Sequence, residues 1–177
     1  MAFDAYCYSV AQQSVIPGET QDEAMSAKKA FEVLSFEFGA ENNINIGSIT
    51  GGGAAGKATF KELSITKKTD TASTGLFKAL CTGQHFDDLV IELRRAGGGA
   101  SATSSGKTFM KFDMRLVMVQ DMTWSGSDGD DICEESVTLQ YGAIQIHYFK
   151  QDAKGAMAAK PEEAKWSRVK NNASLTV

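Results

Sequence analysis

The sequence lacks the features that several common functions require. It carries 22 acidic residues against 18 Lys and Arg, a formal net charge of −4 at pH 7, whereas nucleic-acid-binding proteins usually present a basic surface. The pairs Lys67-Lys68 and Arg94-Arg95 are local exceptions, and we expect them on solvated faces. No apolar run approaches the roughly 18 residues that span a membrane. The sequence therefore argues against a nucleic-acid partner and against membrane insertion.

Cysteine and histidine are scarce. Cys7, Cys81 and Cys133 are odd in number and lack the spacing of metal ligands, so they favour folding in a reducing compartment. Two histidines supply few ligands for zinc, and we expect no metal. A Cys81–His85 dyad would need a third, orienting group, and we expect a buried structural cysteine at position 81 instead.

The N-terminal segment MAFDAYCYSV does not have the composition of a secretory signal peptide. It contains an acid at Asp4, no basic residue and no long apolar segment. If the protein leaves the cell, we expect export that does not depend on a cleaved signal.

The alternation of apolar and polar residues indicates a mainly β protein. Strands are predicted over 31–40, 57–68, 89–93, 108–122 and 135–149, where apolar and polar residues largely alternate. Glycine-rich polar runs at 41–56 and 96–107 are predicted to be loops. A single helix follows residue 68, because Asp70, Thr71 or Ser73 can cap its start and Gly83 suits its end. Its apolar stripe is expected to contain Leu76, Phe77 and Leu80.

The alternation also predicts which side chains share a face. In 31–40, Leu34, Phe36 and Phe38 lie opposite Phe31 and Val33. In 108–122, one parity is apolar throughout: Met110, Phe112, Met114, Leu116 and Met118. In 135–149 the apolar parity slips by one at Gly142-Ala143, which indicates a bulge or a sharp bend. Several strands with one helix predict an antiparallel barrel or sandwich.

The segment ITGGGAAGKATF at 49–60 contains most of a nucleotide-binding P-loop. Gly51 is followed by four residues and then by Gly56-Lys57. A P-loop also needs a helix after the lysine and a hydroxyl for magnesium. Here Ala58 stands in the hydroxyl position and the next residues have a strand pattern, so we interpret the segment as a loop.

Two acidic features are better explained as structural than as a metal site or a catalytic pair. SGSDGDD at 125–131 suggests calcium, but Ile132 and Cys133 occupy positions that an EF-hand loop needs for other residues, and an acidic turn between strands is expected. Asp87 and Asp88 are adjacent, so on a strand they point to opposite faces. No catalytic set remains, and we predict that the protein is not an enzyme and uses no cofactor.

Three stretches, taken in order, resemble the haemolysin-coregulated protein (Hcp) family of type VI secretion tube proteins. The first joins IPGET at 16–20 to FEVLSFEFGA at 31–40. The second is ITKKTDTASTGLFKALCTGQHFDDLVIELRRAG at 65–97. The third is FMKFDMRLVMVQDMTWSGSDGDDICEESVTLQYGAIQIHYF at 109–149.

This resemblance implies an antiparallel β-barrel with one α-helix that assembles into a hexameric ring. It implies rings stacked into a hollow tube, with a spike protein and a sheath as partners and small secreted effectors in the lumen. Assembly would take place in the bacterial cytoplasm, followed by secretion without a cleaved signal peptide. Residues 1–150 would form the barrel domain and 151–177 a C-terminal tail, which is too short for a fused enzyme domain. The tail is polar, and Trp166 is its one candidate anchor.

In relatives, a loop equivalent to 41–56 contributes to ring stacking. The resemblance therefore implies inter-ring or inter-subunit contacts in this loop, and the predicted contact residues are Asn42, Asn43, Ile44, Ile46 and Ile49. Two other functions remain open on the residues alone. One is nucleotide binding by the Gly51–Lys57 loop, and the other is a secreted adhesin or lectin-like β-sandwich.

Overall fold

The computed structural model describes residues 3–45, 54–95, 106–151 and 157–177. Its elements, in chain order, are β1 (Asp4–Tyr8), α1 (Glu23–Ser26), β2 (Phe31–Val33), β3 (Ser35–Glu37), β4 (Ala40–Asn45), β5 (Ala54–Phe60), β6 (Leu63–Lys68), α2 (Thr71–Thr82), β7 (His85–Arg95), β8 (Lys107–Ser125), β9 (Glu134–Tyr148) and β10 (Glu162–Ser167). The predicted mainly β fold is confirmed, with α1 as a short helix that the sequence did not predict.

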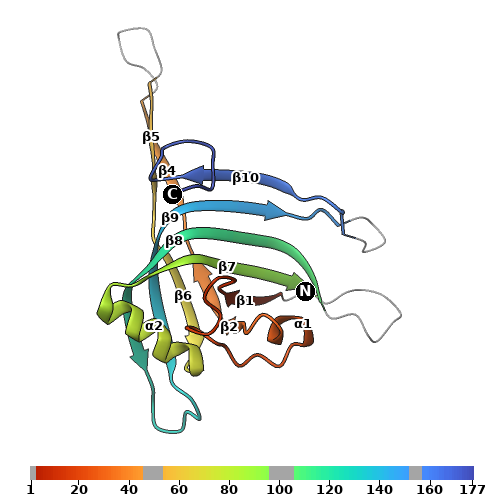
Figure 1. The fold of residues 1–177 in the computed structure, drawn as a ribbon, viewed down its shortest axis with the longest axis vertical. Coiled ribbons are helices and arrows are strands. Elements are labelled where there is room, and N and C mark those ends of the chain that lie inside the picture. The colour runs from red at the N-terminus through yellow and green to blue at the C-terminus, as the bar shows by residue number, and fades with distance from the viewer. Residues whose placement is uncertain (1–2, 46–53, 96–105, 152–156) are drawn as a thin grey trace.

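One antiparallel sheet curls into a nearly closed barrel (Figure 1). Its strands follow the order β2-β1-β7-β8-β9-β6-β3. Residues 31–37 close it, because β2 pairs with β1 and β3 pairs with β6 at the opposite end of the order. Where this segment passes from one partner to the other, the backbone amide of Leu34 donates to the carbonyl of Thr66 at 2.7 Å.

That crossing corrects the prediction of one continuous strand over 31–40. Phe31 and Val33 are buried, and Phe36 and Phe38 pack against the core. Leu34 was expected to share the face of Phe36 and Phe38, but its side chain is 51% exposed. The reason is that Leu34 lies between β2 and β3, where the strand alternation is interrupted.

The barrel bends where Leu116 of β8 faces Gly142 of β9. The predicted phase slip at Gly142-Ala143 is confirmed, since Tyr141 is buried before the slip and Ile144 after it. The unbroken parity predicted for 108–122 is wrong. Leu116 has a φ of 51°, after which Val117 is buried and Met118 is exposed. Both strands therefore change phase at the same level of the barrel.

Helix α2 begins and ends as the sequence predicts. The Asp70 carboxylate accepts from the amide of Ala72, and the Ser73 hydroxyl accepts from the amide of Asp70, which completes a capping box. Gly83 ends the helix in the left-handed conformation with a φ of 67°. Leu76 is buried and Leu80 packs against the core, whereas Phe77 is 48% exposed and contacts the Trp124 ring edge to face.

Two of the basic residues expected on solvated faces are buried. Lys67 is enclosed at the start of α2, where its ammonium lies 2.7 Å from carboxylate oxygens of both Asp70 and Glu135. Arg94 forms an ion pair of 2.6 Å with Asp22, the residue that caps α1. The neighbouring Lys68 and Arg95 are exposed. A charge can be buried when it is paired in this way.

The C-terminal segment continues the sheet. Strand β10 pairs antiparallel with β9, from Glu162 opposite Tyr148 to Ser167 opposite Ala143. Strand β9 therefore has β8 along one edge, while β6 and β10 divide the other. The division into a barrel domain at 1–150 and a tail at 151–177 stays a prediction.

A hairpin and the groove at its base

Strands β4 and β5 form a hairpin that extends away from the barrel (Figure 1). Ala40 pairs with Phe60, Asn42 with Ala58 and Ile44 with Ala55, with a register shift between Asn42 and Ile44. The prediction that 41–56 is a loop is therefore wrong at both ends of this segment, which belong to β4 and β5. Asparagine, alanine and glycine are poor strand formers, so the pairing across the hairpin overrides their local preference.

The hairpin contains the predicted contact residues as far as the structure describes them. Asn42 is exposed on β4, and Asn43 and Ile44 follow on the same strand. Ile46 and Ile49 lie outside the described residues. The structure does not test whether these five residues make contacts with another subunit.

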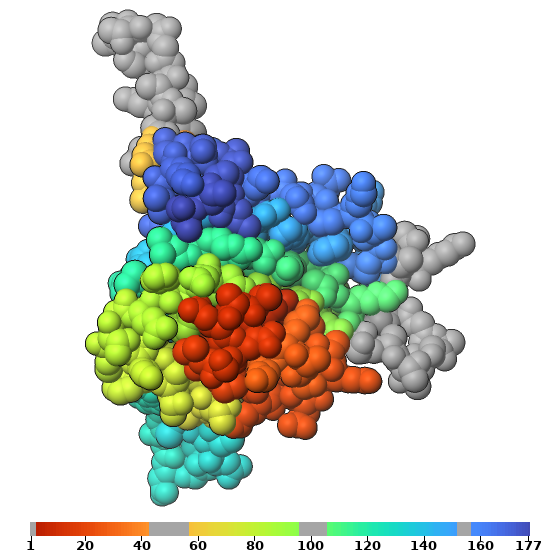
Figure 2. All heavy atoms as spheres, in the orientation of Figure 1, coloured from red at the N-terminus to blue at the C-terminus, as the bar shows by residue number. Residues whose placement is uncertain are grey.

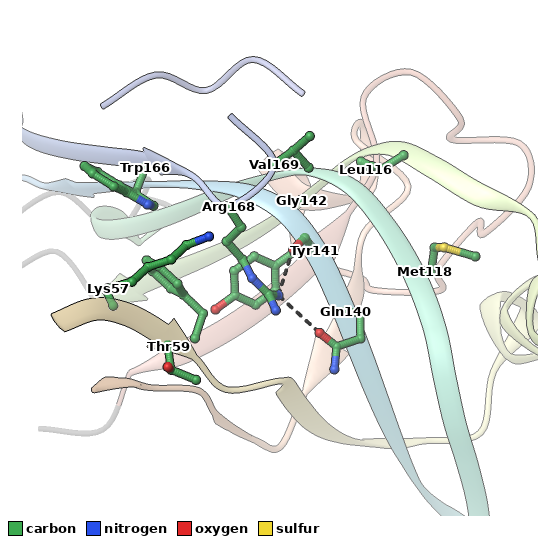
Figure 3. A pocket seen from close by; sticks show the side chains of 12 residues that line it. Lys57, Thr59, Leu116, Met118, Gln140, Tyr141, Gly142, Trp166, Arg168 and Val169 are labelled. Carbon is green, nitrogen blue, oxygen red and sulfur yellow. Dashed lines mark hydrogen bonds between the residues drawn. The ribbon is translucent and has the colours of Figure 1, made fainter. Parts of the chain in front are cut away.

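The hairpin also settles the geometry of the P-loop-like segment. Gly56 and Lys57 lie within β5, and the next element is β6. In the part of the chain that the structure describes, no helix follows Lys57 closely enough for its N-terminal amides to hold a phosphate. The lysine side chain instead lines a groove at the base of the hairpin (Figure 3).

This groove has a volume of about 550 Å³. Four parts of the chain line it: 57–60 of β5, the bend of β8 at Leu116 and Met118, residues 140–142 of β9, and 166–169 at the end of β10. Its walls are mainly apolar and aromatic, with Phe60, Tyr141 and Trp166 among them. Figure 2 shows the C-terminal residues against the base of the hairpin.

Arg168 holds the C-terminal wall of the groove in place. Its guanidinium donates to the Gln140 side-chain oxygen at 3.1 Å and to the Tyr141 carbonyl at 2.8 Å (Figure 3). It also lies over the Tyr141 ring, 5.0 Å from the centroid, and 5.9 Å from that of Phe60. Such cation–π contacts add to the hydrogen bonds. The sequence identified Trp166 as an anchor but did not predict Arg168.

Tyr141 joins the bend of the barrel to the segment after the hairpin. Its hydroxyl donates to the carbonyl of Lys61 at 3.1 Å. Burial raises the pKa of the Tyr141 hydroxyl, and the positive charge of Arg168 opposes that rise. The tyrosine is thus a neutral hydrogen-bond donor rather than a base.

The other candidate residues form no site. Cys7 is buried, and its thiol pKa is raised by burial. Cys81 is exposed rather than buried as expected, since it lies on the outward side of α2. His85 lies 3.6 Å from Asp87. Asp87 is exposed and Asp88 is buried, so the prediction that the two aspartates point to opposite faces is confirmed.

The acidic stretch at 125–131 lies between β8 and β9, as predicted. Among the described residues, no group of three or more His, Cys, Asp or Glu is placed to hold a metal ion. In the same part of the chain, no helix has the length and apolar character needed to cross a membrane.

Sequence comparison assigns the barrel and its hairpin to a known family. Residues 8–148 match the family described as "Type VI secretion system effector, Hcp". The chain belongs to the Hcp family. Hcp proteins are secreted, structural tube proteins of type VI secretion, so the recognition made from the three sequence stretches is confirmed.

Individual relatives agree with this assignment. Protein hcp1 of Pseudomonas aeruginosa is 29% identical over 111 residues, which span 63% of this chain and 65% of that protein. A solved structure described as a type six secretion system protein is 31% identical, covers 97% of this chain and 99% of its own, and has a TM-score of 0.82. Hcp1 of Salmonella typhimurium, at 23% identity and a TM-score of 0.68 with coverage of 97% and 99%, shares the fold.

Proposed function

We propose that this Hcp protein is the repeating subunit of a type VI secretion inner tube. Six copies form a ring, and rings stack into a hollow tube that is exported with the spike protein. Small effectors travel in the lumen, and the sheath surrounds the tube. The observation that carries the proposal is the β4–β5 hairpin, which extends from a barrel of the Hcp family and exposes Asn42 and Lys57 near its base.

Exposed apolar side chains support association between copies. Phe77 and Trp124 form an edge-to-face aromatic pair with ring centroids 5.7 Å apart, yet the two residues are 48% and 42% exposed. Leu34 and Ile132 are 51% and 48% exposed and line a common depression near the start of α2. Apolar surface of this kind is buried when subunits associate.

The groove at the hairpin base offers a complementary surface. Its lining includes Leu116, Met118 and Trp166, and the hairpin sequence supplies Ile44, Ile46 and Ile49. In this proposal the isoleucines of one copy pack into the groove of a copy in the next ring. Each copy supplies both a hairpin and a groove, so the contact joins two different surfaces rather than two copies of one surface.

Sedimentation velocity of the purified protein tests ring formation and stacking together. We expect a hexamer and larger multiples of it. The double variant Ile46→Ser/Ile49→Ser should keep the hexamer and lose the larger species. A wild-type protein that sediments as a monomer at all concentrations would contradict the ring, and a double variant with undiminished larger species would contradict hairpin stacking.

A cross-link tests the hairpin–groove contact directly. In a Cys81→Ser/Cys133→Ser background, Ile49→Cys and Met118→Cys on one chain should form disulfide-linked ladders under mild oxidation. The matched control places the second cysteine at Lys78, which is exposed on α2. Equal ladders from both pairs would show that the contact is not specific to the groove.

A further inference from the structure

His147 of β9 lies between two carboxylates from the neighbouring strands. Its Nδ1 is hydrogen-bonded to Oε1 of Glu163 on β10 at 3.0 Å, and its Nε2 lies 2.8 Å from Oδ2 of Asp113 on β8, close enough for an ion pair but without the angles of a hydrogen bond. The side chains of His147 and Asp113 are only 14% and 11% exposed, whereas that of Glu163 is 48% exposed. The imidazole therefore connects three adjacent strands on the polar face of the sheet.

The protonation state of His147 decides whether both contacts are favourable. A neutral imidazole carries one N–H, so one of its two nitrogens must present a lone pair to a carboxylate oxygen. Only the imidazolium has a hydrogen for each carboxylate. Because the ring occupies the space between Asp113 and Glu163, loss of the proton leaves a lone pair facing one carboxylate and removes the positive charge from both contacts.

The charged groups around His147 come from every neighbouring strand. Lys111 of β8 has its ammonium 3.2 Å from Oδ2 of Asp113, and Glu92 of β7 is the cross-strand partner of Lys111. On β10, Lys165 is the cross-strand partner of Gln145, whose amide donates to Glu163 at 3.1 Å. Histidine is the residue type whose charge usually changes between about pH 5 and pH 8.

We propose that His147 is a proton-operated clamp that holds β10 against β9. Protonated, it ties Glu163 and the start of β10 to the barrel. When it is neutral, β10 keeps its backbone bonds and the Arg168 anchor at its other end, but its first residues open more often. The clamp is thus closed on the acid side of the imidazole titration and loosens as the pH rises through it.

The clamp acts on the strand that supplies one wall of the groove. Trp166 lies on β10, and Arg168 and Val169 follow it directly. If the groove receives a neighbouring hairpin, which rests on the proposed function, protonation of His147 favours the arrangement that stacks. The clamp itself is a property of one chain and is measured without reference to stacking.

Amide hydrogen exchange of the full-length protein, followed by mass spectrometry, tests the clamp. After correction for the intrinsic exchange rate at each pH, residues 162–167 should be roughly 3- to 10-fold less protected at pH 8.5 than at pH 5.5, as loss of a partly exposed ion pair implies. Strand β6, which pairs with the other half of β9, serves as the internal reference and should not change.

Variants assign the effect to His147. His147→Gln should give low, pH-independent protection of 162–167, while His85→Gln, which removes the only other histidine, should behave as the wild type. If His147→Gln does not fold, Glu163→Gln should reduce the pH effect to less than about 2-fold, since an amide does not repel a neutral imidazole. Flat wild-type protection, or a pH effect that survives both substitutions, overturns the proposal.

Discussion

Lys67 shows how strongly a single buried charge organises this barrel. Its ammonium contacts Glu135, Asp70, the Ser73 hydroxyl at 3.0 Å and the Lys68 carbonyl at 2.7 Å. The Glu135 carboxylate in turn accepts from Ser73 at 2.7 Å. The network joins β6, β9 and the N-terminus of α2, so the cap of the helix and the sheet depend on one another.

Replacing Lys67 by Met should destabilise the protein by about 3–5 kcal/mol, because it leaves the buried Glu135 carboxylate without its cation. Chemical denaturation measures the change. Lys68→Met is the matched control, since the adjacent side chain is exposed and its loss should change the free energy of unfolding by less than about 0.5 kcal/mol. Equal effects at the two positions would contradict the role of the buried pair.

The Glu92 carboxyl makes the stability of the folded protein depend on pH in the acidic range. Burial alone would raise the pKa of this carboxyl, but hydrogen bonds from Lys28, Thr108 and Tyr8 outweigh it and lower the pKa below 4.5. A carboxyl with a lowered folded-state pKa contributes stability above its unfolded pKa and loses it as the pH falls through the folded value. The Glu92 contribution is therefore complete above about pH 5 and declines below it.

Urea unfolding of the wild type and Glu92→Gln between pH 3 and pH 6 checks this dependence. The wild type should lose more stability on acidification than the variant, because the amide that replaces the carboxylate has no proton to gain. Glu162→Gln, on an exposed side chain, should follow the wild-type curve. A variant with the full wild-type slope would show that Glu92 does not contribute to the acid sensitivity.

At the scale of elements, close approach of the backbone fixes the position of α2. A Cβ atom at Gly75 would lie 1.8 Å from the carbonyl oxygen of Val15 and 2.9 Å from its carbonyl carbon. The helix therefore packs directly on the segment that joins β1 to α1. A side chain at position 75 requires a shift of the backbone rather than a change of rotamer.

Gly75→Ala should destabilise the protein by about 3 kcal/mol or more, although alanine favours a helix interior by about 1 kcal/mol over glycine. Thermal or urea unfolding measures it. Thr74→Ala, one residue away on the exposed side of α2, should be close to neutral. A stabilising Gly75→Ala substitution would show that the helix does not sit this close to Val15.

How far the sequence predicts these elements depends on where their determinants lie. Asp70 and Gly83 are local signals, and both ends of α2 were predicted correctly. Glu135, the partner of Lys67, is 68 residues away in the chain, so no local pattern could show that Lys67 is buried. The bend was found in β9, where Gly142 marks it, and missed in β8, where Leu116 takes up a positive φ without a glycine.

The segment proposed to carry the contacts has a different form from the one predicted. The segment at 41–56 was expected to carry the contacts, and Asn42 is exposed there. Its ends are strands because they pair with each other, which residue propensities alone do not indicate. The groove depends on four distant segments that meet at the bend, so it has no signature in the sequence beyond Trp166.

At the scale of the whole molecule, the barrel, the hairpin and the exposed apolar side chains support the proposal that this protein is a subunit of a larger assembly. The chain belongs to a family of secreted tube proteins, and its surface retains aromatic and aliphatic side chains that a solitary barrel would leave in water. In the proposed ring assembly these side chains would gain a partner, and the hairpin would have a target in the next ring.

Electron microscopy of the negatively stained, purified protein tests this account most directly. The account predicts annular particles whose class averages have six-fold symmetry, together with short stacks that disappear in the Ile46→Ser/Ile49→Ser variant while the rings remain. Solitary barrels at every concentration, or rings of another symmetry, would contradict it.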